Sequence, residues 1–388
     1  MFRCRVTAFQ SQRCRRFSQW KYRNNDNGHT SNKITGSTFF SGIWKIPATL
    51  GFAFIGFLQW QHLTQTTDEE RKTHPAAALR RLPGSNYTAF ENTMATERQL
   101  QSLKLFPYRA VSRLWGEVHN KELPMWLREP VYKAWTAVFD CKLDEMKYPL
   151  RNYANLGEFF SRPLKDGARP FDRTPGHLAS PVDGTVASIG EVDDSNNVPL
   201  LEQIKGARYR LDEFIGDLPS FFADKTLGKK MCYCVLYLAP GEYHRIHAPV
   251  DWQVDERRHF PGNLFPVNHN AARLIPSLFV ENERVALLGK WEHGFFSLTA
   301  VGATNVGSIV ITKEPEFCTN TAAQDFLVGQ CIANKYSDHC HTARGEEMAQ
   351  FKLGSTVVLV FEAPTSFQFT IKPGDKLLLG KCIGKVVA

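Results

Sequence analysis

Residues 351–364 read FKLGSTVVLVFEAP, a strongly apolar run that follows a Gly-Ser pair. Short runs rich in β-branched and aromatic residues and bounded by Gly and Pro are typical of strands. Because no clear helical pattern separates the runs of this kind, we expect a mostly antiparallel β core, built as a sandwich or a barrel. Comparable runs fill the chain from about residue 180 onward: GTVASIGEV (184–192), CYCVLYLA (232–239), RVALLGKW (284–291), FFSLTAVGA (295–303), GSIVIT (307–312) and KLLLGKCIGKVV (376–387).

The chain ahead of this β-rich part has a helical pattern. Apolar residues recur at helical spacing in residues 99–119, where Pro107 interrupts the run, and again in residues 127–146. Such stripes pack into a core or contact a membrane surface. We therefore predict an α+β fold, with helices in front and β structure behind. Three aromatic residues of the second stretch recur at i, i+3 and i+7: Tyr132, Trp135 and Phe139.

The positive charge is confined to the N-terminus. The chain of 388 residues has a formal net charge of +8, and residues 1–60 hold nine basic residues against one acid, Asp26. The rest of the chain is neutral as a whole, so its charge gives no reason to expect nucleic-acid binding. Residues 1–38 are basic, nearly free of acids and interspersed with hydroxyls and Phe, which is typical of a mitochondrial transit peptide.

Residues 39–60, FFSGIWKIPATLGFAFIGFLQW, would form a helix of roughly 33 Å, long enough to cross a bilayer core. Basic residues precede this segment and residues 68–70 (DEE) follow it. The positive-inside rule then places the N-terminus in the matrix and the following domain on the other side of the inner membrane. A buried or interfacial hairpin helix is the alternative. Polar residues 61–98 are expected to form a linker, and residues 99–388 the main folded domain.

Three segments carry residue types suited to chemistry: SPVDGTV (180–186), YLAPGEYHRIHAPVD (237–251) and the Gly-Ser pair of FKLGST. Asp183 lies in an Asp-Gly turn, and His244 and His247 follow a Pro-Gly turn. Asp, His and Ser in one chain permit nucleophilic catalysis, in which the acid orients the base and the base activates the hydroxyl. Spacing alone does not show that Asp183, His247 and Ser355 meet.

Other uses of these residues stay open. The two histidines could bind a metal, but no third ligand follows at a standard spacing, so we expect no metal here. A serine hydrolase would use Ser355, His247 and Asp183. A non-enzymatic module is a further alternative, because SPVDGTV and KPGDKLLLGKCIG (372–384) resemble the two halves of a biotinyl or lipoyl barrel. The run His339-Cys340-His341 is expected to be an exposed loop.

The longer motifs decide between these alternatives. Besides LGST (353–356), YHRIH (243–247) and SPVDG (180–184), the chain contains PLRNYANLGEFFSRPLKDGARPF (149–171), QIKGARYRL (203–211), FPVN (265–268), LFVENER (278–284), VGATNVGSI (301–309) and RGEEMAQFKLGST (344–356). In this order they resemble the mitochondrial type of phosphatidylserine decarboxylase. The resemblance covers roughly residues 100–388, and the first 98 residues resemble that family only in kind.

The resemblance implies a proenzyme that cuts itself between Gly354 and Ser355. The Ser355 hydroxyl would attack the Gly354 carbonyl and form an ester, with His247, oriented by Asp183, as the base. β-Elimination would then release the upstream chain and leave dehydroalanine, which would take up water and lose ammonia to give a pyruvoyl group on the new N-terminus. The products would be a β chain that ends at Gly354 and an α chain of residues 355–388, which stay associated.

The pyruvoyl group derived from Ser355 is the implied cofactor. Its carbonyl would take the substrate amine as a Schiff base and serve as an electron sink, so that phosphatidylserine becomes phosphatidylethanolamine and CO2. The implied substrate-contacting residues are His244 and Phe265, and either His244 or His247 would return the proton.

The remaining expectations concern location and partners. The protein is expected to be a single-pass protein of the mitochondrial inner membrane, with its catalytic domain (99–388) facing the intermembrane space. Its partner is a bilayer lipid, phosphatidylserine, and the oligomeric state is left open. Because acyl chains resist transfer to water, we expect the mouth of the active site to face the bilayer. Residues 99–146 are the candidate docking surface, with Trp115, Trp126 and Trp135 among its contacts, and the alternative is that these aromatic residues belong to the core.

Overall fold

The structure is a computed structural model. It describes residues 100, 103–192, 199–204, 207–218, 228–267, 272, 275–305, 308–352 and 356–387. The transit peptide (1–38), membrane span (39–60) and linker (61–98) lie outside these residues and stay predictions, and Gly354 and Ser355 lie outside them too. Among the described residues, no helix is both long enough and apolar enough to cross a membrane.

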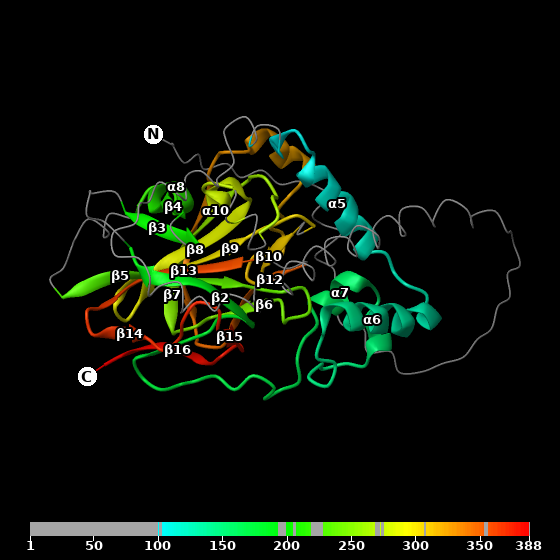
Figure 1. Ribbon diagram of the computed structural model, residues 1–388, viewed down its shortest axis with the longest axis horizontal. Coiled ribbons are helices and arrows are strands. Elements are labelled where there is room, and N and C mark those ends of the chain that lie inside the picture. The colour runs from blue at the N-terminus through cyan, green and yellow to red at the C-terminus, as the bar shows by residue number, and fades with distance from the viewer. Residues whose placement is uncertain are drawn as a thin grey trace, which may run out of the picture. The chain divides into compact units, whose positions relative to one another are not determined.

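One eight-stranded sheet forms the centre of the described region (Figure 1). Every pair of neighbouring strands in it is antiparallel, which confirms the mostly antiparallel β core. Its edges are β11 and β15, so the described strands form an open sheet. They do not form a closed barrel, which was one of the two expected forms. In spatial order the strands are β11 (Ile332–Thr342), β7 (Trp252–Phe260), β8 (Arg284–Trp291), β9 (Gly294–Val301), β13 (Thr356–Pro364), β5 (Lys229–Tyr237), β2 (Gly184–Glu191) and β15 (Lys376–Leu377).

Strand β13 lies between β9 and β5, in the interior of this sheet. It is the apolar part of the FKLGSTVVLVFEAP segment, and its residues 356–361 are all buried. Thr356 lies opposite both Val301 of β9 and Tyr237 of β5. Fully burying one large apolar side chain contributes about 1.5–3 kcal/mol. The strand that directly follows the Gly-Ser pair therefore contributes strongly to the stability of the fold.

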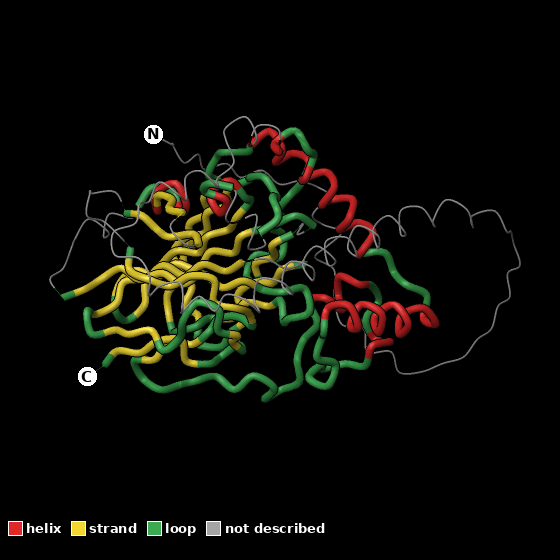
Figure 2. The backbone as a smooth tube through the Cα atoms, viewed as in Figure 1, coloured by secondary structure: helices red, strands yellow, loops and turns green. Residues whose placement is uncertain are grey.

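Three smaller antiparallel sheets complete the described β structure (Figure 2). Two of them join distant parts of the chain, because the last strand pairs with the first, and the strand that leads to the Gly-Ser pair lies beside the strand that ends at His247. The sheets are β1 (His177–Ala179) with β16 (Cys382–Val386) and β14 (Phe367–Phe369); β10 (Ile309–Ile311) with β12 (Glu347–Phe351) and β6 (Arg245–His247); and β3 (Leu200–Ile204) with β4 (Ala207–Arg210).

Two longer helices precede the β core, and short helical turns join the later strands. As predicted, α5 begins after Pro107 and a second helix, α6, follows Pro124. The expected continuation of α6 to residue 146 is wrong: the helix ends at Phe139, because Asp140 adopts a left-handed conformation with φ 52°. The named helices are α5 (Tyr108–His119), α6 (Met125–Phe139), η2 (Leu150–Asn152), α7 (Leu156–Phe160), α8 (Leu211–Ile215), α10 (Leu278–Glu281) and η4 (Ala322–Leu327).

The aromatic stripe of α6 belongs mainly to the core. Tyr132 stacks on Phe159 of α7 with ring centroids 4.7 Å apart, and Trp135 meets Phe160 edge to face. Tyr132 and Trp135 are both buried. The expectation that Trp135 contacts a bilayer is therefore wrong, because its ring already packs inside the protein.

Candidate active site

A turn after β5 carries the two candidate histidines. β5 ends at Tyr237, the Pro240-Gly241 pair follows, and β6 ends at His247. Gly241 is needed for a close approach, since a Cβ at this position would overlap the carbonyl oxygen of Phe139 at the end of α6. Any other residue would push the histidine-bearing segment away from α6.

Both ring nitrogens of His247 have a hydrogen-bond partner. Because a carbonyl oxygen can only accept, Nδ1 must donate to Gly345, 2.8 Å away, and Nε2 then accepts from the Tyr243 hydroxyl at 3.0 Å. Burial lowers the pKa of His247, while the Gly345 carbonyl and the charges of Glu347 and Asp183 oppose this shift. The result is a neutral imidazole with its lone pair on Nε2, the form that a general base requires.

The Gly345 carbonyl that holds His247 comes from a left-handed residue. Gly345 has φ 89°, a conformation that side-chain-bearing residues adopt only with strain. Its own N–H donates to the carbonyl of Ala248 at 2.9 Å. Two contacts thus join residue 345 to the end of β6, and they fix the tautomer and orientation of the imidazole.

Asp183 is buried at the start of β2 and binds a different partner from the one expected. Arg169 donates to both of its carboxylate oxygens, at 2.9 and 2.7 Å, and the backbone N–H of Leu379 donates at 2.7 Å. Arg169 also binds Glu145 at 2.7 Å. Among the described residues no hydrogen bond joins Asp183 to His247, so the carboxylate acts on the imidazole through its charge, which partly opposes the lowering of the His247 pKa by burial.

His244 is fully buried, and one of its nitrogens has no partner. Its Nδ1 donates to the carbonyl of Glu242 at 2.8 Å, and its ring packs on Phe160 with centroids 4.1 Å apart. Nε2 has no hydrogen-bond partner in the described part of the chain. Burial lowers the pKa of His244 to about 3. An unpaired buried acceptor costs about 1–3 kcal/mol, and a catalytic role is one of the reasons why a folded protein keeps such a group.

The residues on each side of the Gly-Ser pair are held against this histidine segment. The N–H of Phe351 donates to the carbonyl of His244 at 3.0 Å, and that of Lys352 donates to Ser308 at 3.0 Å. Thr356 lies opposite Tyr237, the last residue of β5. The described chain therefore enters and leaves the segment 353–355 beside the turn that carries the histidines.

Phe265, the expected substrate-contacting residue, is held through its own backbone by the side chain of Asn282. The two histidines do not hold it. Asn282 accepts from its N–H and donates to its carbonyl, both at 2.9 Å, and also donates to Gly302 at 3.0 Å. The buried Phe265 ring meets Tyr108 of α5 edge to face at 5.4 Å. Gly302 follows Val301, which lies opposite Thr356. The hydrogen bonds of Asn282 therefore connect the FPVN segment to β9 and β13.

Sequence reasoning missed several side chains of this site. Burial raises the pKa of Glu242 to about 7 and lowers the pKa of Lys352. No sequence pattern predicts either shift. Arg169, Tyr243 and Gly345 all lie inside motifs quoted above, but their contacts with Asp183 and His247 become visible only in the fold. Their closeness in the sequence to predicted site residues could have indicated them. Glu242 and Tyr243 lie just before His244, and Lys352 lies three residues before Ser355.

Comparison with known proteins gives a consistent result. Residues 156–385, more than half of the chain, match the family model described as phosphatidylserine decarboxylase. The mitochondrial phosphatidylserine decarboxylase proenzyme of Pongo abelii is 42% identical over 307 residues, covering 73% of each chain. Proenzyme 1 of Oryza sativa is 39% identical over 343 residues, 73% of this chain and 78% of the relative, and that of Saccharomyces cerevisiae is 36% identical over 362 residues, 72% of each.

The β core and the buried histidine site thus belong to an enzyme, and the matches show of which kind. The chain belongs to the phosphatidylserine decarboxylase family. This assignment sets aside the serine hydrolase and the non-enzymatic module. The two segments that suggested a lipoyl-like module do lie together, since Lys376 and Leu377 of β15 pair with Thr185 and Gly184 of β2.

Proposed function

We propose that this enzyme cuts itself between Gly354 and Ser355 and then converts phosphatidylserine to phosphatidylethanolamine and CO2. The observation that carries the proposal is the state of His247, a neutral imidazole fixed through Nδ1 on a strand that pairs with β12. β12 ends at Phe351, three residues before the cleavage bond. The relatives' names support the processing step, because they describe those proteins as proenzymes.

In the cleavage step His247 accepts the Ser355 hydroxyl proton at Nε2. Nδ1 cannot serve, because its own proton is committed to Gly345. The Tyr243 hydroxyl, which now donates to Nε2, must move aside for Ser355. As the imidazole gains charge, the buried carboxylate of Asp183 stabilises it, since the negative charge of Asp183 opposes the lowering of the His247 pKa by burial.

The described residues fit a pyruvoyl group derived from Ser355. His244 offers a buried Nε2 that has no hydrogen-bond partner among the described residues, and the amine of Lys352, whose pKa burial lowers, lies in the segment that leads to Ser355. Once formed, the pyruvoyl group would supply the electron sink for loss of the substrate carboxylate as CO2. His244 receives and returns a proton at Nε2. It does not hold the substrate carboxylate, because a neutral Nε2 and a carboxylate are both acceptors.

The two chains produced by cleavage would stay associated through β13. This strand lies between β9 and β5, and its apolar side chains are fully buried: Val357, Val358, Leu359, Val360 and Phe361. Residues 367–386 add β15 at one edge of the central sheet, and β16 and β14 to the small sheet that begins with β1. The α chain could leave only if the central sheet opened.

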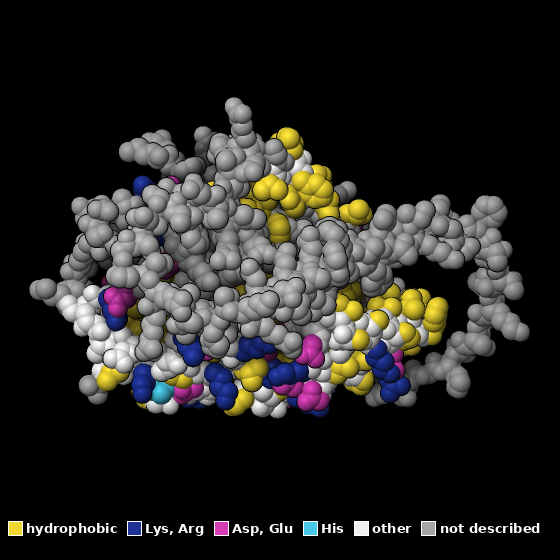
Figure 3. Space-filling view, in the orientation of Figure 1, with side chains coloured by type: hydrophobic (Ala, Val, Ile, Leu, Met, Phe, Trp, Pro, Cys, Tyr) yellow, Lys and Arg dark blue, Asp and Glu magenta, His cyan; other side chains and the backbone are white. Residues whose placement is uncertain are grey.

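We further propose that an apolar surface on α5, α6 and η4 docks on the bilayer that holds the substrate. Large apolar side chains gather over α5 and α6 (Figure 3). η4 lies beside α5, because Arg109 and Arg113 both bind Asp325. The exposed residues of this surface are Leu105, Phe106, Leu114, Met125, Trp126 and Phe326. Of the three tryptophans expected here, Trp126 is 75% exposed, Trp115 is half-buried and Trp135 is buried.

Vesicle binding by a chain that begins at residue 99 tests this docking surface, because it lacks residues 39–60. We expect it to cleave itself and to bind phosphatidylserine-containing vesicles more weakly than the full chain. Trp126→Ala should weaken that binding further, whereas Trp135→Phe, a buried control, should not. A cleaved chain that shows no vesicle binding would mean that residues 39–60 alone hold the enzyme at the membrane.

The proposed location follows the mitochondrial relatives. We place the protein in the inner membrane with one span at residues 39–60 and residues 99–388 in the intermembrane space. Protease should then degrade the catalytic domain after rupture of the outer membrane but not before it. A domain that stays protected until the inner membrane is dissolved would place it in the matrix.

A cleavage gel beside a CO2-release assay tests the proposed reaction. Ser355→Ala should leave one uncut chain without decarboxylase activity, because Ser355 is both the nucleophile and the source of the cofactor. His247→Ala and Asp183→Asn should also block cleavage. Two chains in the Ser355→Ala variant would contradict the proposal.

A further inference from the structure

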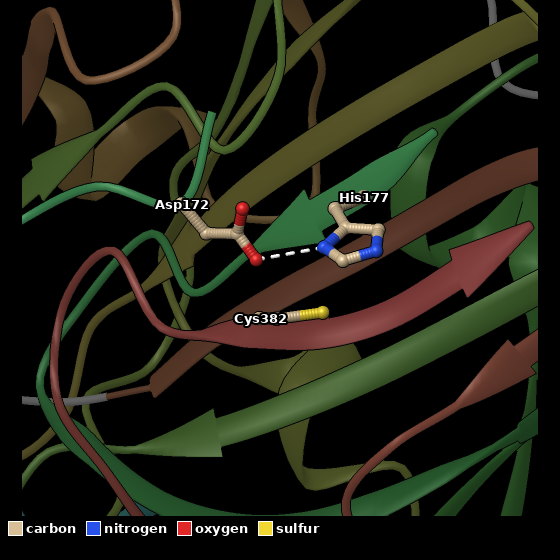
Figure 4. Close-up of side chains that lie close together, drawn as sticks. All are labelled: Asp172, His177 and Cys382. Carbon is tan, nitrogen blue, oxygen red and sulfur yellow. Dashed lines mark hydrogen bonds and ion pairs between the residues drawn. The ribbon is translucent and has the colours of Figure 1, made fainter. Parts of the chain in front are cut away.

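Three side chains able to coordinate a metal meet at the small sheet of β1, β16 and β14. They are Asp172, His177 and Cys382, and one carboxylate oxygen, one ring nitrogen and the sulfur all lie within 4.8 Å of one another. The Asp172 carboxylate faces the His177 ring, and the Cys382 sulfur lies beside this pair (Figure 4). None of the three takes part in the chemistry proposed above.

Strand pairing brings these residues together from the two ends of the β region. His177 lies in β1, which pairs with β16, and Ala179 is the partner of Cys382. The register shifts between Leu178 and Ala179, and such bulges redirect side chains from the regular alternation. Cys382 can therefore lie on the side of the sheet that His177 occupies.

Backbone contacts hold Asp172 in place before any ion binds. Its N–H donates to the carbonyl of Gly380 at 2.8 Å, and its side-chain Oδ1 accepts from the N–H of Thr174 at 2.9 Å. Arg344 donates to its backbone carbonyl at 3.0 Å. Only Oδ2 faces His177, whose Nδ1 lies 2.7 Å away. The carboxylate is thus oriented with one oxygen directed toward the other two ligand atoms.

The donor set selects the kind of ion. A thiolate, an imidazole and a carboxylate are ligands of zinc, whereas magnesium and calcium take oxygen ligands only. Zinc-bound atoms at about 2.0–2.3 Å from the metal lie roughly 3.5 Å apart, so small side-chain rotations would complete the geometry. The side chains of His177 and Asp172 are 25% and 22% exposed, which leaves a fourth position for water.

We propose that Asp172, His177 and Cys382 form a binding site for zinc. The thiol loses its proton to solvent. His177 gives up the hydrogen bond from Nδ1 to Asp172 Oδ2, changes to its Nε2–H tautomer and binds the metal through Nδ1. The weak contacts of the Cys382 sulfur, to Gly384 at 3.4 Å and Thr370 at 3.9 Å, are given up for the metal. The ion ties β16, near the end of the chain, to residues 172–177.

The link that zinc makes between β16 and residues 172–177 matters more if the chain is cut as proposed. Asp172 and His177 then belong to the large fragment and Cys382 to the small one, so zinc would join the two fragments. That consequence rests on the proposed cleavage, but the zinc site itself does not. An uncut chain that binds one zinc would contradict the proposed function and support the site; a cut chain that binds none would do the reverse.

Metal titration of the full-length enzyme, purified without a histidine tag and kept reduced, tests the site. We expect one equivalent of zinc to bind, and cobalt(II), used as a spectroscopic probe, to give a thiolate charge-transfer band. Cys382→Ser should abolish that band and weaken zinc binding by more than the ~10–100-fold typical of removing an outer-shell partner. His177→Gln should weaken it comparably. Zinc should raise the melting temperature of the native enzyme but not that of Cys382→Ser.

Cys340→Ser is the matched control, because Cys340 is also half-buried and has histidines on both sides. It should bind zinc and cobalt as the native enzyme does. Three results would overturn the proposal: no zinc binding, binding that both Cys382→Ser and His177→Gln retain, or a cobalt band lost with Cys340→Ser. In each case Asp172 and His177 form only a hydrogen-bonded pair beside a free thiol. Should Cys382→Ser not fold, the comparison of His177→Gln with Cys340→Ser decides.

Discussion

His244 separates self-cleavage from decarboxylation most sharply. Burial lowers the pKa of His244 to about 3, so at pH 7 its Nε2 carries no proton and can accept one. The step that needs a proton moved at this atom comes after the pyruvoyl group exists. We therefore expect His244→Ala to cleave normally and to lose about 10²–10⁴-fold in decarboxylation rate, the usual contribution of a general acid–base group.

The stability of this variant can be bounded from the same contacts. Emptying a fully buried ring site costs about 2–5 kcal/mol. Deleting Nε2, which has no partner among the described residues, returns about 1–3 kcal/mol. The net loss is at most a few kcal/mol, so a folded, cleaved protein can be assayed. Phe160→Leu is the matched control, because it removes the ring that packs on His244 but keeps the imidazole.

The assay measures CO2 release per mole of cleaved enzyme across a range of substrate concentrations. His244→Ala should lower kcat with little change in KM, and Phe160→Leu should stay within about tenfold of the native rate. If His244→Ala does not cleave while His247→Ala does, the two roles are reversed. If His244→Ala cleaves and decarboxylates at nearly the native rate, Nε2 moves no proton in the reaction.

The other predictions concern three neighbouring features. Burial raises the pKa of Glu242 to about 7 from 4.5, so its contribution to stability is present below pH 4.5 and is lost as the pH rises through 7. Above pH 7, the free energy of unfolding of Glu242→Gln, measured with urea, should thus exceed that of the native enzyme by up to about 3 kcal/mol, and below pH 4.5 the two should be equal. If the difference between the two proteins is the same at all pH values, the raised pKa of Glu242 is refuted. Tyr243→Phe frees Nε2 of His247 and should cleave at least as fast as the native chain in a time-course gel, whereas a block would make the hydroxyl essential. Leu359→Ala, in β13, should lower the free energy of unfolding by about 2–5 kcal/mol, and an unchanged urea midpoint would mean that this strand adds little.

The strands that were predicted are those that are stabilised by the burial of their own apolar side chains. β13, β8 and β9 carry apolar runs and are almost entirely buried. β7 could not be predicted, because WQVDERRHF is charged; its Arg257 is buried only because it pairs with Glu314, 57 residues away. Likewise His339-Cys340-His341 is not the expected loop but part of β11, an edge strand that pairs with β7.

The candidate site was predicted as a set of residue types but not as an arrangement. Motifs indicated Asp183, His244 and His247, whose chemistry is intrinsic to their side chains. The carbonyl that orients His247 belongs to Gly345, 98 residues further along the chain, and no local pattern encodes that contact. The same holds for Arg169, which takes both oxygens of Asp183 and so replaces the direct hydrogen bond expected with His247.

The mass of the smaller fragment tests the central claim most directly. The purified enzyme should separate into two chains under denaturing conditions, and the smaller one should comprise residues 355–388. Its mass should be lower, by one molecule of ammonia, than that of the same peptide beginning with serine, and its N-terminus should resist sequential degradation. A single uncut chain, or a fragment that begins with an ordinary Ser355, would contradict the account.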